Sequence, residues 1–232
     1  IIQVAKALQH AHPRGLIHRD VKPKNIMLTS AGQVKLADMG LAREVDDAKA
    51  ATAEAGRAYG TPYYISPEQI RGEINIDARA DIYSLGATFY HMVAGRVPFE
   101  GASPSAVMHK HLKEPITPPD HINTRLTSAI GEIIEVMMAK NADDRYQSVA
   151  ELLDDLEAAL RGEAPMQARK HYNSDLLDDL ASGGEVIDFE LDRRPAPTGG
   201  AQGIPSGWLL AVGLLLFLSV LINLFQWLNG KP

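Results

Sequence analysis

The sequence predicts an α+β domain that is mainly α-helical with one small β-hairpin, followed by a flexible linker and one transmembrane helix. Short apolar runs at 26–28 and 34–36 enclose the turn-forming residues 29–32, which predicts the hairpin. Apolar residues recur at helical spacing in several segments up to residue 160. After that the composition becomes acidic and proline-containing, and a long stretch without charge follows.

Residues 1–160 contain four segments with helical periodicity. The chain opens inside the first one with no start signal before it, so we expect a chain truncated at its N-terminus. In the last one, Ser148 and Glu151 form an S-x-x-E capping box. The apolar positions are Ile1, Val4, Ala5 and Leu8; Ile82, Leu85, Phe89 and Met92; Ile130, Ile133, Ile134, Met137 and Met138; and Val149, Leu152, Leu153, Leu156 and Leu160.

Charge and cysteine content exclude several classes of function. The chain has 29 acids against 23 bases and a formal charge of -6, with no clustered basic face. A nucleic-acid partner usually requires such a face, so we expect none. Cysteine is absent, which excludes disulfides, cysteine-ligated zinc and a thiol nucleophile.

A linker, an apolar segment and a short tail follow the domain predicted for residues 1–160. Residues 161–203 are acidic and contain proline and glycine, which is typical of a flexible juxtamembrane linker. Residues 204–229 include the apolar run from Trp208 to Leu228, and about 20 such residues suffice to cross a bilayer as a helix. The alternative, a buried core helix, has no nearby partner in the sequence. Residues 230–232 form a short tail.

Two sequence features in these regions are open to more than one interpretation. Ser219, Asn223 and Gln226 share one face of the apolar helix and favour a homodimer; the alternative is that Asn223 and Gln226 simply approach the lipid headgroups. Leu-Leu-Asp-Asp-Leu occurs at 152–156 and again at 176–180. The second copy is interpreted as a short transient helix or as a docking motif.

The residues that could carry chemistry surround the predicted hairpin. Asp20, Lys22 and Asn25 lie on the loop before it, and Asp38 follows its second strand. Because the hairpin returns the chain to its starting point, Asp38 and Asn25 are expected to share a site. One carboxylate and one amide oxygen suit Mg²⁺, which retains waters and phosphate oxygens as its other ligands.

Several motifs in this chain stand in the same order as in protein kinases. They are His18-Arg19-Asp20-x-Lys22-x-x-Asn25, Asp38-Met39-Gly40, Ser66-Pro67-Glu68, Asp81-Ile82-Tyr83-Ser84-Leu85-Gly86, Gly95-x-x-Pro98-Phe99 and Arg145. On these residues the chain resembles the eukaryotic-like (Hanks-type) Ser/Thr kinases, of the bacterial transmembrane type. The resemblance covers about residues 1–160. It implies the mainly helical C-terminal lobe of a protein kinase-like α+β fold.

The resemblance implies a role for each matching residue in ATP- and Mg²⁺-dependent transfer to protein substrates. Asp20 would orient or accept the proton of the substrate hydroxyl, and Lys22 would neutralise charge on the phosphoryl group. Asn25 and Asp38 would ligate Mg²⁺, and Met27 would pack beneath the adenine. Lys22 together with Thr61 is similar to the Ser/Thr-specific pattern rather than the tyrosine-specific one.

Other matching residues would have structural or regulatory roles. By resemblance, His18, Met39 and Asp81 would support the catalytic loop, and Glu68 and Arg145 would form a buried ion pair. Arg19 lies beside Asp20, where a phosphate on the segment 38–68 would pair with it. Thr52 is the candidate phosphosite, the alternative being an unmodified loop residue.

The sequence also departs from the kinase pattern. It contains no glycine-rich loop after a strand and no strand lysine, so the ATP-clamping N-lobe is missing and we expect little activity from this chain alone. Met39 replaces the usual Phe, and Ala142 replaces a common Pro. The predicted location is the cell membrane, single-pass, with the kinase domain in the cytoplasm. The alternative function is a non-catalytic, membrane-anchored pseudokinase or binding module.

Overall fold

The computed structural model describes residues 1–38, 43–44 and 61–170. The chain divides into two units, residues 1–184 and 185–232, and the described residues all belong to the first. The elements are α1 (Ile2–Ala11), η1 (His12–Arg14), β1 (Leu16–Ile17), η2 (Pro23–Asn25), β2 (Ile26–Leu28), β3 (Val34–Leu36), β4 (Arg43–Glu44), α3 (Pro67–Arg71), α4 (Arg79–Ala94), α5 (Pro104–Lys113), α6 (Pro119–Ile122), α7 (Ser128–Met137), η4 (Ala142–Asp144) and α8 (Val149–Leu160).

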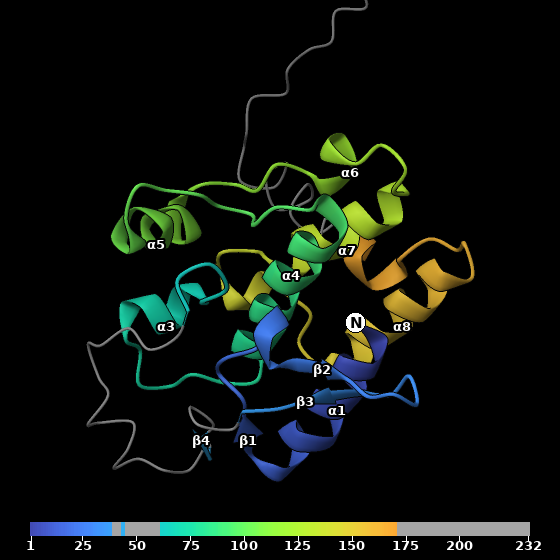
Figure 1. Ribbon diagram of the computed structural model, residues 1–232, viewed down its shortest axis with the longest axis horizontal. Helices are drawn as coiled ribbons and strands as arrows, with labels where there is room; N and C mark the ends of the chain where they lie inside the picture. The colour runs from blue at the N-terminus through green and yellow to red at the C-terminus, as the bar shows by residue number, and fades with distance from the viewer. Residues whose placement is uncertain (39–42, 45–60, 171–232) are drawn as a thin grey trace, which may run out of the picture. The chain divides into compact units, whose positions relative to one another are not determined.

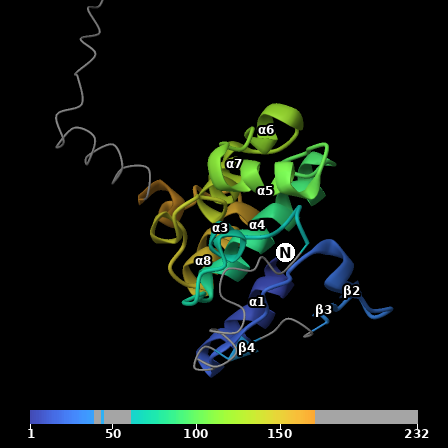
Figure 2. The same cartoon turned by 90° about the vertical axis from the view of Figure 1, so that its left-hand side faces the viewer.

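Helix α4 is the centre of the fold, with the other helices packed around it (Figures 1 and 2). All of its residues from Ala80 to Tyr90 are buried, which a helix can tolerate only when other elements cover it on every side. Gly86 allows α7 to come close, since a Cβ at this position would lie 2.8 Å from the Cβ of Met137. The sequence predicted the helix, but Met92 is 59% exposed rather than buried because it belongs to the less covered C-terminal end of α4.

The predicted hairpin is present with the predicted strand limits. Strands β2 and β3 pair antiparallel, with Ile26 opposite Leu36 and Leu28 opposite Val34. Beyond the last pair, the backbone N–H of Ala37 donates to the carbonyl of Asn25 at 2.8 Å. This bond brings the residue before Asp38 against Asn25. A second two-stranded ladder pairs β1 with β4.

Helices α3 and α8 begin with side-chain caps that the local sequence explains. Ser148 accepts from the backbone N–H of Glu151 at 3.3 Å, as its S-x-x-E motif predicts. The Glu151 carboxylate, however, accepts from the backbone N–H of Gln147, one residue earlier than in a standard capping box. Helix α3 has the reciprocal arrangement, in which Ser66 and Gln69 each accept from the other's backbone N–H.

No helix among residues 1–38, 43–44 and 61–170 is long and apolar enough to span a membrane. The span predicted for residues 204–229 lies outside the described residues. So do the polar stripe at 219–226 and the second Leu-Leu-Asp-Asp-Leu segment.

Candidate active site

Asp20 lies at the centre of a compact group of side chains. Lys22 Nζ donates to Asp20 Oδ2 at 2.6 Å and to Thr61 Oγ1 at 2.8 Å. Asn25 Nδ2 donates to the Asp20 carbonyl at 2.9 Å and to Oδ2 at 3.2 Å. Thr61 Oγ1 contacts Oδ1 at 3.4 Å. Oδ2 therefore receives two donors and Oδ1 only one long contact, so Oδ1 retains the capacity to accept a proton from a hydroxyl group.

Asp81 on α4 fixes the backbone of the loop that carries Asp20. This carboxylate is fully buried and accepts from the backbone N–H of His18 at 2.8 Å and of Arg19 at 2.7 Å. His12 Nε2 donates to it as well, at 2.9 Å. A buried carboxylate is costly unless its oxygens are hydrogen-bonded, and here three donors meet that requirement.

Arg19 has a left-handed backbone with φ of 67°, which is unusual for a residue with a Cβ. The two bonds from Asp81 hold this conformation from one side. Gln69 holds it from the other, because its Nε2 donates to the Arg19 carbonyl at 2.8 Å. The Arg19 side chain is 5% exposed.

His18 links the loop to the chain that follows the hairpin. Its Nε2 lies 3.1 Å from the carbonyl of Ala37, and a carbonyl only accepts, so this nitrogen carries a proton. In the neutral ring Nδ1 is then an acceptor, and the backbone N–H of Asp20 points to it at 3.4 Å. His18 therefore connects Asp20 with the residue before Asp38.

The side chains of Asn25 and Asp38 offer one amide oxygen and one carboxylate, which are suitable ligands for Mg²⁺. The amide nitrogen of Asn25 is directed at Asp20, which leaves its Oδ1 as the atom able to ligate a cation. Asp38 is exposed and has a φ of 64°. Among the described residues no group of three or more His, Cys, Asp or Glu side chains could hold a metal. One carboxylate with one amide matches a hard cation that takes its other ligands from water and phosphate.

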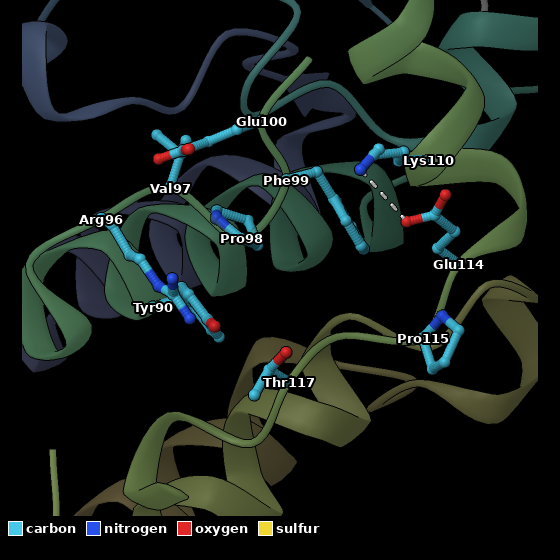
Figure 3. Close-up of a pocket in the computed structure, with 10 residues that line it drawn as sticks. All are labelled: Tyr90, Arg96, Val97, Pro98, Phe99, Glu100, Lys110, Glu114, Pro115 and Thr117. Atoms are coloured by element: carbon cyan, nitrogen blue, oxygen red, sulfur yellow. Dashed lines mark ion pairs between the residues drawn. The ribbon is translucent and has the colours of Figure 1, made fainter. Parts of the chain in front are cut away.

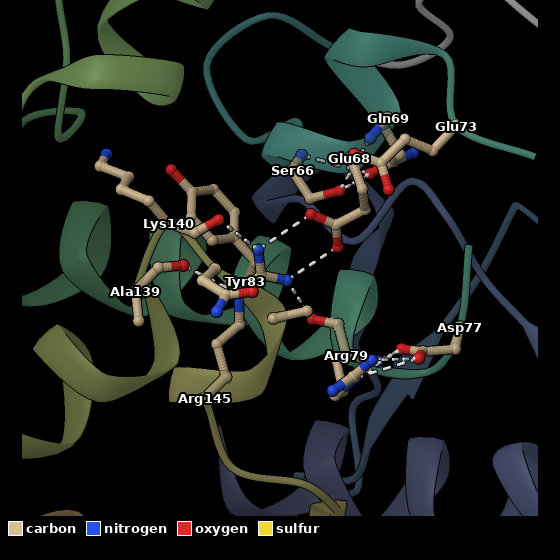
Figure 4. Close-up of polar contacts among 12 residues, drawn as sticks. Ser66, Glu68, Gln69, Glu73, Asp77, Arg79, Tyr83, Ala139, Lys140 and Arg145 are labelled. Carbon is tan, nitrogen blue, oxygen red and sulfur yellow. Dashed lines mark hydrogen bonds and ion pairs between the residues drawn. The ribbon is translucent and has the colours of Figure 1, made fainter. Parts of the chain in front are cut away.

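Glu68 and Arg145 form a buried ion pair that connects α3 with the end of η4 (Figure 4). Both guanidinium NH groups donate to the carboxylate, at 2.7 and 2.8 Å. The remaining N–H groups donate to the carbonyls of Ala139, Arg79 and Lys140. The guanidinium also lies 4.9 Å from the centre of the Tyr83 ring. The pair expected from the sequence is thus present and shielded from solvent.

A second buried cluster lies between α4 and α5. Tyr83 and His111 Nδ1 are joined at 2.8 Å, and the His111 ring packs edge-on against Phe99. Burial lowers the pKa of His111 to about 3, with a further contribution from Lys140. Burial likewise lowers the pKa of Lys140 to about 8, and its Nζ lies 4.5 Å from the centre of the Phe99 ring. These values mean that His111 is neutral at physiological pH.

A polar pocket of about 220 Å³ lies beside Phe99 at the C-terminal end of α4 (Figure 3). Arg96 and Tyr90 lie on one side of it, and Lys110 pairs with Glu114 on another. None of its lining residues belongs to the group around Asp20. The pocket is therefore separate from the candidate active site around Asp20.

Some of the site residues predicted from the sequence lie apart from the group around Asp20 or fall outside the described residues. Met27 lies on β2 and is 58% exposed. Met39 and Thr52 fall outside the described residues. Sequence analysis missed Gln69 and His12, whose partners are 50 and 69 positions away. The S-x-x-Q pattern at 66–69 is the one local signal that could have drawn attention to Gln69.

A loop carboxylate held between a lysine and a threonine, above a buried helix that fixes its backbone, defines the C-terminal lobe of a protein kinase. Comparison with known proteins agrees, since residues 1–155 match the family model described as protein kinase domain. The chain belongs to the protein kinase family, in the eukaryotic-like (Hanks-type) Ser/Thr branch of bacteria.

Curated relatives carry the same classification. Serine/threonine-protein kinase PknB of Mycolicibacterium smegmatis is 34% identical over 239 residues, which cover 100% of this chain and 38% of that protein. Probable serine/threonine-protein kinase PknB of Corynebacterium glutamicum is 42% identical over a match that covers 75% of this chain and 28% of that protein. Serine/threonine-protein kinase PknB of Mycobacterium tuberculosis is 39% identical over a match that covers 71% of this chain and 26% of that protein. The chain thus spans well under half the length of these relatives.

Proposed function

We propose that this chain supplies the phosphoacceptor half of a Ser/Thr protein kinase, which transfers the γ-phosphoryl group of ATP to hydroxyl groups of protein substrates. The arrangement around Asp20 carries the proposal. Its carboxylate is held at one oxygen by Lys22 and Asn25, while the other oxygen keeps room for a substrate hydroxyl. The names of the relatives point to the same activity.

Asp20 and Lys22 have different roles in the phosphoryl transfer. The substrate hydroxyl donates to Asp20 Oδ1, and its proton passes to the carboxylate as the new O–P bond forms and the bond between γ-phosphorus and ADP breaks. Lys22 Nζ neutralises charge on the phosphoryl group as it moves. Because Lys22 also donates to Thr61, the segment that receives the substrate is tied to the catalytic loop.

Asn25 and Asp38 would hold Mg²⁺, which neutralises phosphate charge when bound. The bond between Ala37 N–H and the Asn25 carbonyl keeps the two residues on neighbouring backbone. A φ of 64° at Asp38 turns the chain there. Met27 would lie beneath the adenine, where an exposed apolar side chain is suitable.

We also propose membrane attachment through residues 204–229, with the kinase domain on the cytoplasmic side where ATP is present. The mainly apolar run from Trp208 to Leu228, which contains no charged residue, supports this. Ser219, Asn223 and Gln226 would favour a homodimer within the bilayer. Replacement of Asn223 and Gln226 by Leu should lower the dimer fraction in a membrane association assay, and an unchanged fraction would contradict the dimer.

A kinase assay of the full-length gene product tests the proposed activity. Asp20→Asn keeps the size of the side chain but removes the proton acceptor, so turnover should fall by roughly 10²-fold or more. Asp154→Asn is the control, because Asp154 is exposed on α8 and has the same chemistry. A wild-type protein that binds nucleotide without phosphorylating any protein would contradict catalysis and favour the pseudokinase.

Phosphorylation of Thr52 would regulate this activity by placing a phosphate near Arg19, the cation beside the catalytic Asp20. Phosphopeptide mapping of the active full-length enzyme should find the modification. An unmodified Thr52 in enzyme of full activity would contradict it.

A further inference from the structure

The chain does not leave the domain at the end of α8. It turns at Gly162, where φ is 78°, and the backbone N–H of Glu163 donates to the Ala158 carbonyl at 2.9 Å. A new helical turn then begins at Met166. Ala168 in this turn is fully buried and belongs to the apolar core. In Figure 1 this segment lies beside α7 and α8. We call residues 163–170 the strap.

The N-terminus of the strap helix is capped by a side chain from another helix. The first residues of a helix leave backbone N–H groups without partners, and Pro165, which precedes the helix, has no side-chain oxygen to accept from them. Asp155 of α8 replaces it, because its carboxylate accepts from Gln167 N–H at 3.0 Å and from Ala168 N–H at 2.7 Å. A negative charge at this end of a helix is also favourable electrostatically.

Asp155 is 2% exposed, and its third donor is Tyr146 Oη at 2.9 Å. Tyr146 is itself fully buried. Its sequence neighbour is Arg145, the partner of Glu68. Hydrogen bonds thus connect the strap with Asp155 and Asp155 with Tyr146, and the peptide bond between Arg145 and Tyr146 leads on to the ion pair that anchors α3.

A second contact to the strap is superficial. Arg169 donates to both carboxylate oxygens of Glu132 on α7, at 2.9 and 3.2 Å. The Arg169 side chain is 49% exposed, and exposed ion pairs contribute little. The buried Asp155 cap is therefore the contact that holds the strap in place.

We propose that the strap is an integral part of the kinase domain and that the Asp155 cap controls the order of α3. The strap lies beyond residue 155, where the match to the family model ends. Displacement of the strap leaves Asp155 and Tyr146 without their fixed geometry and loosens Arg145. The ion pair between Arg145 and Glu68, which anchors the end of the segment 38–68, is weakened in turn. The chain that continues from Lys170 towards the proposed membrane helix thereby acts on substrate binding, a consequence that rests on the proposed function.

Amide hydrogen exchange of the full chain tests the coupling without any activity assay. Three variants weaken the cap from different sides: Asp155→Asn removes charge and acceptor capacity, Tyr146→Phe removes only the hydroxyl, and Ala168→Asp displaces the strap from its own side. Asp155→Asn and Tyr146→Phe should speed exchange in the strap by roughly tenfold or more, as expected for a weakened or lost hydrogen bond to a charged group. Ala168→Asp should speed it at least as much, because it places a charge at a fully buried position. The backbone amides of Glu68–Gly72 should exchange faster with it.

The matched control is Asp154→Asn, since Asp154 is the exposed neighbour of Asp155 on α8. It should leave exchange unchanged throughout. The coupling is overturned if the strap exchanges faster while α3 keeps its protection. It is equally overturned if α4 accelerates by the same factor as α3, because that pattern reports general unfolding. A wild-type protein without kinase activity would contradict the proposed function but not the coupling between the strap and α3.

Discussion

Replacement of Arg145 by Ala should be among the most destabilising single changes in the described part of the chain. The side chain is fully buried and makes five hydrogen bonds, two of them to Glu68 (Figure 4). Deleting one partner of a buried pair costs about 3–5 kcal/mol, since the other charge stays buried. Three backbone carbonyls also lose a donor here, which places the expected loss at the upper end of that range.

Conservative replacements refine this expectation. Arg145→Lys keeps the charge, but an ammonium cannot bridge both oxygens of Glu68 and still reach the carbonyls of Ala139 and Arg79. It should therefore lose roughly half as much stability as the Ala variant. The double variant Glu68→Gln with Arg145→Met removes both charges, so it should be more stable than Arg145→Ala alone.

Urea unfolding of the full chain, followed by circular dichroism, measures these differences. Arg161→Ala serves as the control, because Arg161 follows α8, is exposed and pairs only with Glu163 among the described residues. Its effect should stay within about 0.5 kcal/mol. A loss below about 1 kcal/mol for Arg145→Ala would refute the reasoning, as would a double variant no more stable than the single one.

Three more outcomes are expected. Stability should fall as pH drops from about 6.5 towards 3, because the buried His111, whose pKa is lowered to about 3, stays neutral while the unfolded chain takes up a proton. His111→Gln should flatten this part of the urea-unfolding pH profile, and an unchanged slope would rule out His111 as the cause. Gly86→Ala should lower the melting temperature, because its Cβ would meet Met137 at 2.8 Å and the cost of overpacking, about 1–3 kcal/mol, outweighs the gain in helix propensity. Gly131→Ala should be milder, since the new Cβ meets only the movable end of Asp120; equal losses would contradict this. Lys22→Met should lower phosphorylation by the full-length enzyme much more than it lowers the melting temperature, because Asp20, which loses this ion pair, keeps its hydrogen bond from Asn25; a large loss of stability would instead assign Lys22 a structural role.

Local patterns predicted the parts of this fold that depend on neighbouring residues. The hairpin limits, the Ser148 cap and the α4 periodicity all follow from spacings of a few positions. The group around Asp20 was predictable because its members, apart from Thr61, lie within six positions. Contacts between distant positions left no such local signal, and the Glu68–Arg145 pair was expected only through the kinase resemblance.

The contacts that sequence analysis missed are long-range and involve residue types with many possible roles. His12 at the end of α1 has no local feature that identifies Asp81 as its partner. Asp155 follows the exposed Asp154 in the Leu-Leu-Asp-Asp-Leu segment of α8, yet it is buried as the cap of the strap. Met92 has the spacing of a core residue but lies where α4 is less covered, so periodicity alone assigned it wrongly.

The ladder of β2 and β3 has a consequence for natural variation in length. The proposed metal ligands flank the open end of the hairpin, where Ala37 N–H meets the Asn25 carbonyl, whereas the turn at 29–33 closes the far end. Extra residues inserted in that turn would lengthen the tip and leave the pairing of Ile26 with Leu36 unchanged. A single residue inserted between Leu36 and Asp38 would shift the carboxylate away from Asn25. Homologous chains should therefore differ freely in length at the tip and keep one fixed length at the base.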